Sequence, residues 1–381
     1  MKNLFPALVK DSRRSLYLPF SLGHFANDFV PCSVVVLAPA IALEMGLNPM
    51  EVGLLLTLHT LGSALGFFPA GLLADSARNR GNLLVLTFWW VGLGYLLASW
   101  APGFWSLAFL FALAGCGDAA WHPLATGILV KSDPQNRGQA LGFHAIGGTL
   151  AGVVGPVIVG ILLASMDWRQ TLHLIILPTL LVGLLFLKIR KLVPKQAKLK
   201  AISKEDFQHL WKSWTKKTGL LIICLMSSYH MSLVAMMSMI PLYLREFHGL
   251  SSAMTGLAFG MMVLSGAFMQ PLMGFFSDRA GRRKVIVFGI ATAAVCAFMI
   301  PILENFGLLL MIIMFLLVGV GLLEGVRSSV LAAAVEYTGS REGTTLGFAF
   351  TLMDGIGAFG ALLAGWAAGI PFSHAFLLAG I

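Results

Sequence analysis

The sequence predicts an all-α integral membrane protein built from two six-helix halves. Of its 381 residues, 57% are hydrophobic and only 11% are charged, and the mean hydropathy is +0.84. A water-soluble globule of this length needs far more polar surface than this composition supplies. Long apolar runs recur along the whole chain, and a motif that begins at Gly71 returns at Gly274. The apolar runs predict membrane spans, and the returning motif predicts an internal repeat.

The apolar runs define eleven complete spans and the start of a twelfth. A helix of about 20 residues crosses the bilayer core, and in lipid only a helix or a closed barrel satisfies its own backbone hydrogen bonds. The predicted spans are 17–43, 50–74, 82–100, 103–130, 138–166, 168–189, 218–244, 252–277, 284–303, 306–335 and 343–369. A further apolar run begins at Pro371, and because the sequence ends at Ile381 we expect this last helix to be cut short.

The repeat divides the chain into two halves, 1–189 and 218–381, joined by a basic linker at 190–217. Two such halves, related by an axis along the membrane normal, place a substrate site between them near mid-membrane. The linker carries a variant capping box at 203–206. Four apolar residues then share one helical face: Phe207, Leu210, Trp211 and Trp214. We expect this helix to lie flat on anionic lipid of the inner leaflet; docking of a partner is the alternative.

The basic residues gather in the loops at one end of the predicted bundle. The chain has 26 Lys and Arg against 17 Asp and Glu, for a net charge of +9. Such an excess can indicate nucleic-acid binding, but here it follows alternate loops, and the positive-inside rule puts those loops and both termini in the cytoplasm. We therefore expect no nucleic-acid partner. The absence of an Asn-x-Ser/Thr sequon favours a bacterial inner membrane, and we expect a monomer.

Each half carries a copy of a glycine, aspartate and arginine motif directly after an apolar run. The first copy contains Gly71, Asp75, Arg78 and Arg80, and the second contains Gly274, Asp278, Arg279, Gly281 and Arg282. The first copy lacks the arginine after its aspartate and the second glycine. The glycines permit close helix crossing, and the aspartates can accept from an opposing helix N-terminus or from Arg137 and Arg341. We expect these motifs to form latches that close the cytoplasmic side.

Away from their ends, the spans are interrupted by four acids, Asp28, Asp118, Glu324 and Asp354, and by one basic residue, Arg327. An ionised carboxylate in hydrocarbon costs at least about 2.5 kcal/mol. The four acids must therefore face a watery cavity, be protonated, pair, or bind a cation. Each one is a candidate for the functional site.

Two of these acids have a histidine one helical turn away. His24 and Asp28 lie four residues apart with Asn27 beside them, and Asp118 and His122 repeat the spacing, so each pair can meet on one helical face. A carboxylate beside an imidazole can pass protons near neutral pH. These four residues are the candidates for proton coupling. The alternatives are purely structural hydrogen bonds, or a divalent metal bound by His24, Asp28, Asp118 and His122.

Glu324 and Arg327 lie three residues apart and can pair directly. A guanidinium suits phosphate, phosphonate or carboxylate, so a substrate anion can replace Glu324, although a permanent pair explains the spacing equally well. His230 occupies the repeat position of Asp28. Further candidate substrate contacts are Asn27, His144, His230 and Asp354. A lone histidine on an apolar helix, such as His59, His144 or His173, is more often a structural residue.

The two motif copies resemble the loop 2/3 motif of the major facilitator superfamily. The stretches Ser21–Asp28 and Gly115–Pro123 are similar to the S-x-x-H-x-x-N-D and G-x-G-x-x-x-x-H-P elements of its fosmidomycin resistance branch. Gly152, Gly155 and Pro156 belong to a stretch that is similar to the span-five motif of drug/proton antiporters, although one expected glycine is Ala151. Close helix packing and bending at the proline explain these residues without antiport.

The resemblance implies a major facilitator fold of twelve spans. It also implies an antibiotic or multidrug efflux antiporter that works by alternating access, and Arg327 adds the expectation that its small drug or metabolite is anionic. Inward proton flow would drive it, with no cofactor beyond the proton gradient. One rival interpretation is a transporter of a divalent metal or metal chelate, and another is a membrane sensor or scaffold that transports nothing. Nothing in the sequence indicates an enzyme, because it contains no nucleotide-binding loop, soluble catalytic domain or nucleophile elbow.

Overall fold

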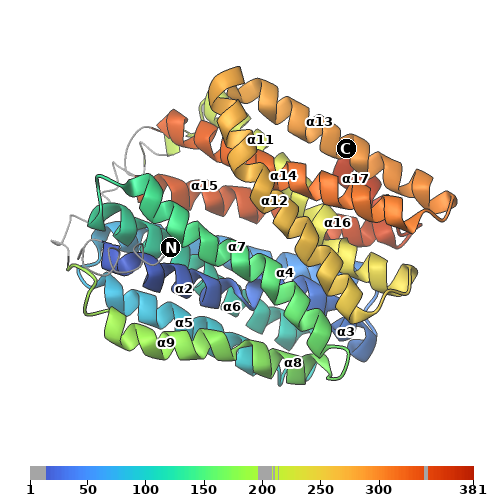
Figure 1. Cartoon of the computed structure of the whole chain (residues 1–381), viewed down its shortest axis with the longest axis horizontal. Coiled ribbons are helices and arrows are strands. Elements are labelled where there is room, and N and C mark those ends of the chain that lie inside the picture. The colour runs from blue at the N-terminus through green and yellow to red at the C-terminus, as the bar shows by residue number, and fades with distance from the viewer. Residues whose placement is uncertain (1–13, 196–207, 209–210, 213, 339–341) are drawn as a thin grey trace, which may run out of the picture.

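The protein is a bundle of long helices in a computed structural model that describes residues 14–195, 208, 211–212, 214–338 and 342–381 (Figure 1). Within those residues no strand occurs. In the described part of the chain, ten helical segments are long and apolar enough to cross a membrane, and an eleventh is counted when one bent pair is taken as a single span. The eleven predicted spans are therefore confirmed, within a few residues at their ends. The chain is a multi-pass membrane protein.

The first half of the chain forms helices that pack mainly on one another, and so does the second. The first set is α2 (Tyr17–Asp28), η2 (Pro31–Ser33), α3 (Val34–Met45), α4 (Pro49–Ser76), α5 (Arg80–Ala98), α6 (Phe104–Ser132), α7 (Arg137–Leu162), α8 (Trp168–Ile175) and α9 (Leu177–Ile189). The second set is α11 (Lys217–Leu242), η3 (Tyr243–Phe247), α12 (Ser252–Ala280), α13 (Arg282–Asn305), α14 (Leu309–Thr338), α15 (Glu342–Gly357), α16 (Phe359–Ala368) and α17 (His374–Gly380).

Local sequence signals explain where several helices begin. Asn48 caps α4 by accepting from the Glu51 backbone N–H, and the Glu51 side chain accepts from the Asn48 N–H in return. Ser251 caps α12 in the same way by accepting from the N–H of Met254. Between α12 and α13 the chain turns at Gly281, whose φ of +95° only glycine adopts without strain.

The first span is broken, which the apolar pattern of residues 17–43 did not indicate. Helix α2 ends at Asp28, and α3 begins at Val34 after a bend of 41°. Pro31 cannot donate a backbone hydrogen bond at this point. The Ser33 hydroxyl donates to the Phe29 carbonyl at 2.6 Å, which satisfies one of the freed acceptors. The break leaves Asp28 at the end of a helix in the middle of the span.

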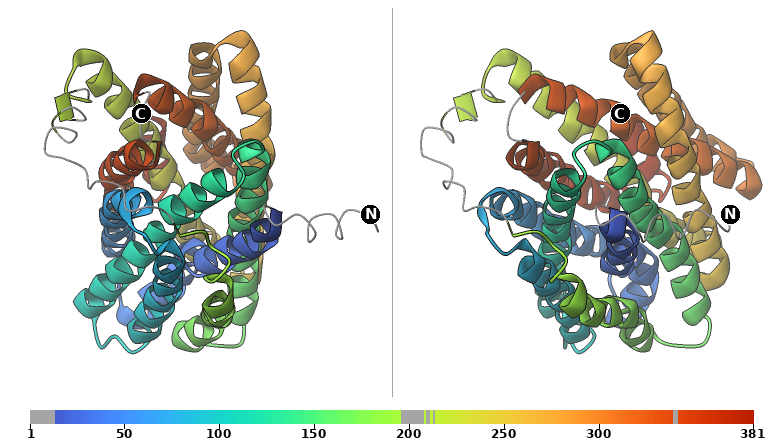
Figure 2. Two further views of the ribbon diagram at one scale, coloured as in Figure 1. Left: turned by 90° about the vertical axis from the view of Figure 1, so that its left-hand side faces the viewer. Right: turned by 60° about the vertical axis from the view of Figure 1, so that its left-hand side comes forward.

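Small residues bring the two halves into close contact. On α4, a side chain at Gly53 would collide with the Ala361 carbonyl of α16, and the Thr57 hydroxyl donates to the Ala358 carbonyl at 2.9 Å. Helices α7 and α12 approach most closely where Gly160 faces Gly256. From that crossing the two helices diverge toward the loops that carry the repeated motif (Figures 1 and 2). We call this the motif end of the bundle, defined by the α4/α5 loop at 77–79 and by Gly281.

Near the motif end, α4 stays packed against α15 while α7 and α12 are apart. Phe67 and Phe350 pack with ring centroids 5.3 Å apart, and the Thr351 hydroxyl donates to the Ala64 carbonyl at 3.0 Å. By contrast, a side chain added at Gly138 or Gly142 of α7 would meet nothing within 4 Å. The halves are thus held together along α4 and separated along α7 at this end.

Only part of the predicted linker helix lies within the described residues. The capping box at 203–206, Phe207 and Leu210 lie outside them. Trp211 is 55% exposed, as expected for a membrane-facing residue, whereas Trp214 is 1% exposed. The Trp214 ring packs on Tyr337 and Phe348, each at 5.7 Å between centroids. The expectation of one lipid-facing stripe is therefore wrong for Trp214, because burial against α14 and α15 competes with burial in lipid.

Candidate transport site

A cavity of about 250 Å³ lies between the two halves. Its lining residues are Pro31, Cys32, Val34, Val35, Leu56, His59, Thr60, Gly152, His230, Leu233, Val234, Met237, Ser238, Phe259, Val263, Glu324 and Arg327. Most of this surface is apolar, and the groups that can ionise come from α4, α11 and α14. A concave, largely apolar site with a few polar groups is the usual form of a small-molecule site.

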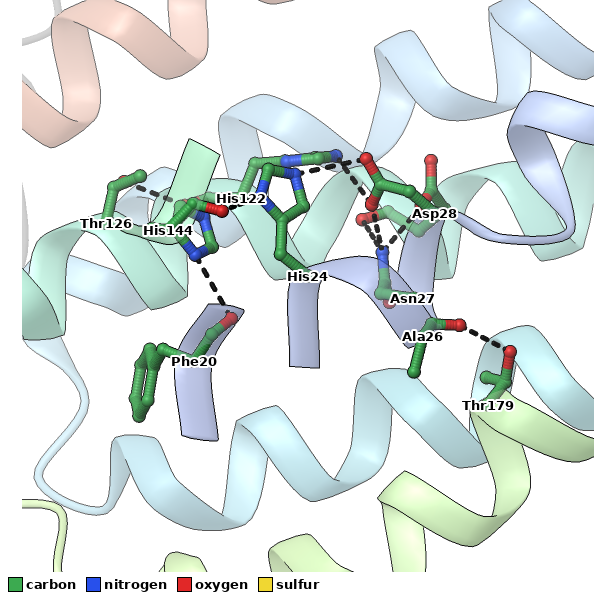
Figure 3. Close-up of polar contacts among 10 residues, drawn as sticks. Phe20, His24, Ala26, Asn27, Asp28, His122, Thr126, His144 and Thr179 are labelled. Atoms are coloured by element: carbon green, nitrogen blue, oxygen red, sulfur yellow. Dashed lines mark hydrogen bonds and ion pairs between the residues drawn. The ribbon is translucent and has the colours of Figure 1, made fainter. Parts of the chain in front are cut away.

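In the first half, His24, Asp28 and His122 meet at one point (Figure 3). His24 Nε2 lies 3.1 Å from Asp28 Oδ2, so the pair predicted from the spacing of four is present. His122 Nε2 lies 3.8 Å from Asp28 Oδ1, although it comes from α6. The two imidazoles approach edge to face, with centroids 5.2 Å apart. All three side chains are partly buried.

A backbone contact determines which nitrogen of His24 carries hydrogen. His24 Nδ1 lies 2.8 Å from the carbonyl oxygen of His144, and since a carbonyl only accepts, Nδ1 donates. A neutral His24 therefore turns the lone pair of Nε2 toward the Asp28 carboxylate. Two acceptors that face each other at 3.1 Å need a proton or another cation between them. The ring is also held by stacking on His144, with centroids 4.1 Å apart.

The predicted contact between Asp118 and His122 is replaced by contacts to α2. The Asn27 amide donates to Asp118 Oδ1 at 2.5 Å and to Asp28 Oδ1 at 3.2 Å, so one buried side chain links the two carboxylates. His122 turns to Asp28 because that carboxylate also faces it across the helix interface. The spacing of four on α6 places Asp118 and His122 close together, but each side chain contacts α2 rather than the other.

The same three residues could hold a metal ion. The donor atoms of His24, Asp28 and His122 all lie within 4.8 Å of one another, and they are the one such group among the described residues. Two imidazoles and a carboxylate suit zinc and related ions. The sequence-based metal hypothesis also included Asp118, which is not a member of this group.

The second half holds a comparable pair that sequence spacing could not reveal. His230 Nε2 on α11 lies 3.3 Å from Asp354 Oδ1 on α15. The imidazole of His230 packs directly on Gly357, where any side chain would collide with it. Both residues were predicted as separate substrate contacts, and only the packing of α11 against α15 joins them.

Arg327 and Glu324 do not form the direct pair that their spacing allows. Glu324 Oε2 accepts from the Gln270 amide at 3.3 Å, and its side chain lies against Gly266 of α12. Arg327 forms no hydrogen bond or ion pair with any described residue, and it lines the cavity. The predicted intrahelical pair is therefore wrong in this state. The Glu324 carboxylate lies against α12 instead, because Gly266 leaves room for it there.

The motif residues of the first half gather around the end of α4. Asp75 Oδ1 lies 3.6 Å from Lys131 Nζ of α6, a partner that the sequence analysis did not name. The buried Arg80 donates to the Gly127 carbonyl of α6 at 3.3 Å, while Arg78 is exposed. Gly71 is buried. These contacts tie α4 and α5 to α6 within one half.

In the second half the motif is more open. Asp278 is 73% exposed and pairs with Arg282 at 3.7 Å. Arg279 lies over the ring of Phe275, 3.8 Å from its centroid. A side chain at Gly274 would meet only Ser328 Oγ, at 3.6 Å. Arg137 is exposed, and Arg341 lies outside the described residues, so the predicted latch between halves stays a prediction.

The glycines of α7 pack closely, as expected. A side chain at Gly152 would lie 3.0 Å from Val263 of α12, and one at Gly155 would lie 2.5 Å from Ser33 Oγ. Pro156 lies inside α7, and its carbonyl oxygen blocks any side chain at Gly256. This stretch therefore forms the crossing of α7 and α12 between the two halves.

A bundle of two packed halves with a cavity between them is the arrangement of membrane transporters built from repeated halves. The family model of the Major Facilitator Superfamily matches residues 20–362, and the chain belongs to that superfamily. Its members are membrane transporters, so the prediction that the protein is not an enzyme is confirmed.

One similarity covers nearly the whole chain. The chain is 24% identical to the fosmidomycin resistance protein of Escherichia coli (strain K12) over 349 residues, which are 91% of this chain and 84% of that protein. A stretch of 151 residues is 33% identical to the probable 4-methylmuconolactone transporter of Cupriavidus pinatubonensis (strain JMP 134 / LMG 1197), covering 38% of this chain and 35% of that one.

A solved structure confirms the fold. It is the crystal structure of a bacterial homologue of the human lysosomal transporter Spinster, in an inward-facing and unoccupied conformation. The TM-score is 0.77 at 18% identity, and the alignment covers 94% of this chain and 83% of the other. At this identity the likeness supports the architecture alone, and the major facilitator fold predicted from the sequence is confirmed.

Proposed function

We propose that the protein exports a small anionic compound in exchange for protons by alternating access. The observation that carries this proposal is the contact between His24 Nε2 and Asp28 Oδ2 at 3.1 Å, with His24 Nδ1 already committed to a carbonyl. A proton between these atoms completes a hydrogen bond, and its loss leaves two acceptors facing each other. Protonation and deprotonation therefore change the local structure of the broken first span.

His122 and Asp118 extend this proton site. His122 offers a second imidazole to Asp28 from α6, and Asn27 links Asp28 to Asp118. A proton bound by this cluster bridges α2 and α6. We infer that binding and release of the proton bias the packing of these helices, which is the differential contact that coupling requires.

Arg327 supports the anionic character of the substrate. It is a guanidinium in the wall of the cavity, near Glu324, that forms no hydrogen bond or close ion pair with the described residues. A cation in a membrane span without such a contact is costly. A phosphonate, phosphate or carboxylate can receive two parallel hydrogen bonds from it. The similarity to a fosmidomycin resistance protein supports export as the direction of transport.

We expect the protein to be a monomer in the inner membrane of a bacterium, surrounded by lipid. Both termini and the motif end would lie on the cytoplasmic side, and protons would be the coupling ion. In the state described, α7 and α12 separate toward the motif end, so the cavity would face the cytoplasm. In the outward-facing state, α7 and α12 would separate at the crossing near Gly160.

Fosmidomycin susceptibility tests this function. A pump-deficient bacterial host expresses the wild type, Asp28→Asn, or the control His173→Gln at matched membrane levels. His173 bonds to Ser99 at 2.7 Å, outside the cavity. We expect protection by the wild type and the control and none by Asp28→Asn, whose amide cannot exchange a proton. Full protection by Asp28→Asn would refute the proton site, and no protection by any protein would refute this substrate.

A second candidate function is transport of a divalent metal or metal chelate. It is favoured by the grouping of His24, Asp28 and His122 within 4.8 Å. In proteoliposomes, metal transport that survives collapse of the proton gradient would support this function against the first. Anion export that stops when the gradient collapses would support the first.

A further inference from the structure

One cavity-lining side chain, His59 on α4, takes no part in the sites described above. Its Nε2 lies 2.6 Å from the hydroxyl of Tyr95 on α5, and Tyr95 is fully buried behind the cavity lining. The ring also packs edge to face on Phe111, with centroids 6.0 Å apart. The sequence alone favours a structural role for His59, because it is a lone histidine on an apolar helix.

The hydrogen-bond partner of Tyr95 determines the tautomer of His59. Among the described residues, His59 Nε2 is the one hydrogen-bond partner of the Tyr95 hydroxyl. If Nε2 carried hydrogen, the buried hydroxyl would be left without an acceptor. The hydroxyl therefore donates to Nε2, and the hydrogen of the neutral imidazole is on Nδ1. Among the described residues, the bond to Tyr95 is the one hydrogen bond of this ring, so Nδ1 is the donor that the ring can offer to a ligand.

His59 and Arg327 belong to different halves of the molecule, so a ligand that contacts both bridges the cavity. Most of the cavity lining is apolar and includes Leu233, Met237 and Val263, while His230 and Glu324 add polar groups to it. We propose that His59 recognises a neutral hydrogen-bond acceptor at the end of the substrate remote from the anionic group bound by Arg327. The substrate class is then a short anion with an apolar middle and a carbonyl-type acceptor at its far end.

This inference rests on the proposed anionic substrate and adds the group that distinguishes one anionic compound from another. Because Tyr95 and Phe111 already hold the imidazole in place, the ring loses little conformational entropy when a ligand binds. An acceptor gains a hydrogen bond to Nδ1, whereas an apolar group of the same shape leaves that N–H unpaired. His59 acts as a specificity-determining residue, and Tyr95 positions it.

Two phosphonates of nearly equal shape test the inference. 3-Phosphonopropanamide carries an amide at its far end, and 3-methylbutylphosphonate replaces that amide with an isopropyl group. Calorimetry on the purified full-length protein in detergent measures the ratio of their affinities. We expect His59→Leu to shift this ratio against the amide by about tenfold, the value of one well-placed hydrogen bond.

Further variants separate recognition from structural damage. His59→Gln keeps an N–H donor and should restore part of the ratio, while Tyr95→Phe frees the imidazole and should give an intermediate value. His173→Gln is the control and should match the wild type. Arg327→Lys should weaken both phosphonates alike. Each variant is first checked for a single peak in size-exclusion chromatography.

The outcomes distinguish this inference from the function on which it rests. If both phosphonates bind but the ratio is the same in the wild type and His59→Leu, the role of His59 is overturned and the anionic substrate stands. If a structural role alone applies, His59→Leu weakens both compounds equally, which also overturns the inference. If the wild type binds neither compound, the anionic substrate class itself is overturned, and the inference with it.

Discussion

Replacing Gly148 with alanine should uncouple transport by moving a single imidazole. Gly148 lies on α7 beside the ring of His24, and a Cβ at this position would lie 2.6 Å from both Cε1 and Nε2 of that ring. Ordinary contacts between such atoms are about 3.5 Å. The imidazole must therefore move by about 0.9 Å, unless α7 itself moves.

The magnitude follows from the contact that the movement breaks. His24 Nε2 lies 3.1 Å from Asp28 Oδ2, and a shift of this size can carry it beyond hydrogen-bond distance. A hydrogen bond to a charged group contributes about 1.5–3 kcal/mol. Its loss should lower the affinity of the proton site by roughly tenfold to a hundredfold. The alternative of shifting α7 costs about 1–3 kcal/mol of overpacking.

Proton-driven export from proteoliposomes, measured across a range of imposed pH gradients, is the assay. Gly142→Ala is the matched control, because it makes the same change on the same helix where a side chain meets nothing within 4 Å. We expect coupled export to fall at least tenfold in Gly148→Ala and to stay within twofold of the wild type in Gly142→Ala. Wild-type coupling in Gly148→Ala would show that the geometry of His24 does not control the proton site, and the reasoning would fail.

Arg327→Lys should impair transport of anionic compounds much more than of neutral ones, because an ammonium cannot reproduce the bidentate contact; equal loss for both in a vesicle transport assay would indicate a structural role. Gly256→Val should prevent α7 and α12 from crossing closely, because its side chain would collide with the Pro156 carbonyl and lie 3.0 Å from Gly160 Cα. The cost of overpacking, about 1–3 kcal/mol, should shift the population away from the described state by fivefold or more. Cysteine cross-linking between α7 and α12 measures that shift with Gly142→Val as control, and unchanged cross-linking would contradict it.

Spacing within one helix predicted which side chains share a face, but it did not predict which of them would pair. The spacing of four between His24 and Asp28 places both side chains on one face of a helix whatever surrounds it, and the pair is present at 3.1 Å. The same spacing between Asp118 and His122 failed to pair them, because Asn27 and Asp28 of another helix compete for both.

Three features of the site depended on packing across distant parts of the chain. The pair of His230 with Asp354 joins residues on α11 and α15, and the donor at His59 depends on Tyr95 of the next helix. Arg327 lacks a direct pair with Glu324 because the Glu324 carboxylate accepts from Gln270 of α12 instead. No periodicity in the sequence encodes any of these choices.

The sequence by itself determined that this protein crosses the membrane many times, that it is built from repeated halves, and which acids lie within its spans. Hydrophobic length and charge decide these properties, since each backbone must satisfy its hydrogen bonds within its own helix. The tertiary structure decided which ionisable groups meet. The free energy of a buried charge depends on its partners, and in a bundle those partners come from whichever helices pack closely enough to supply them.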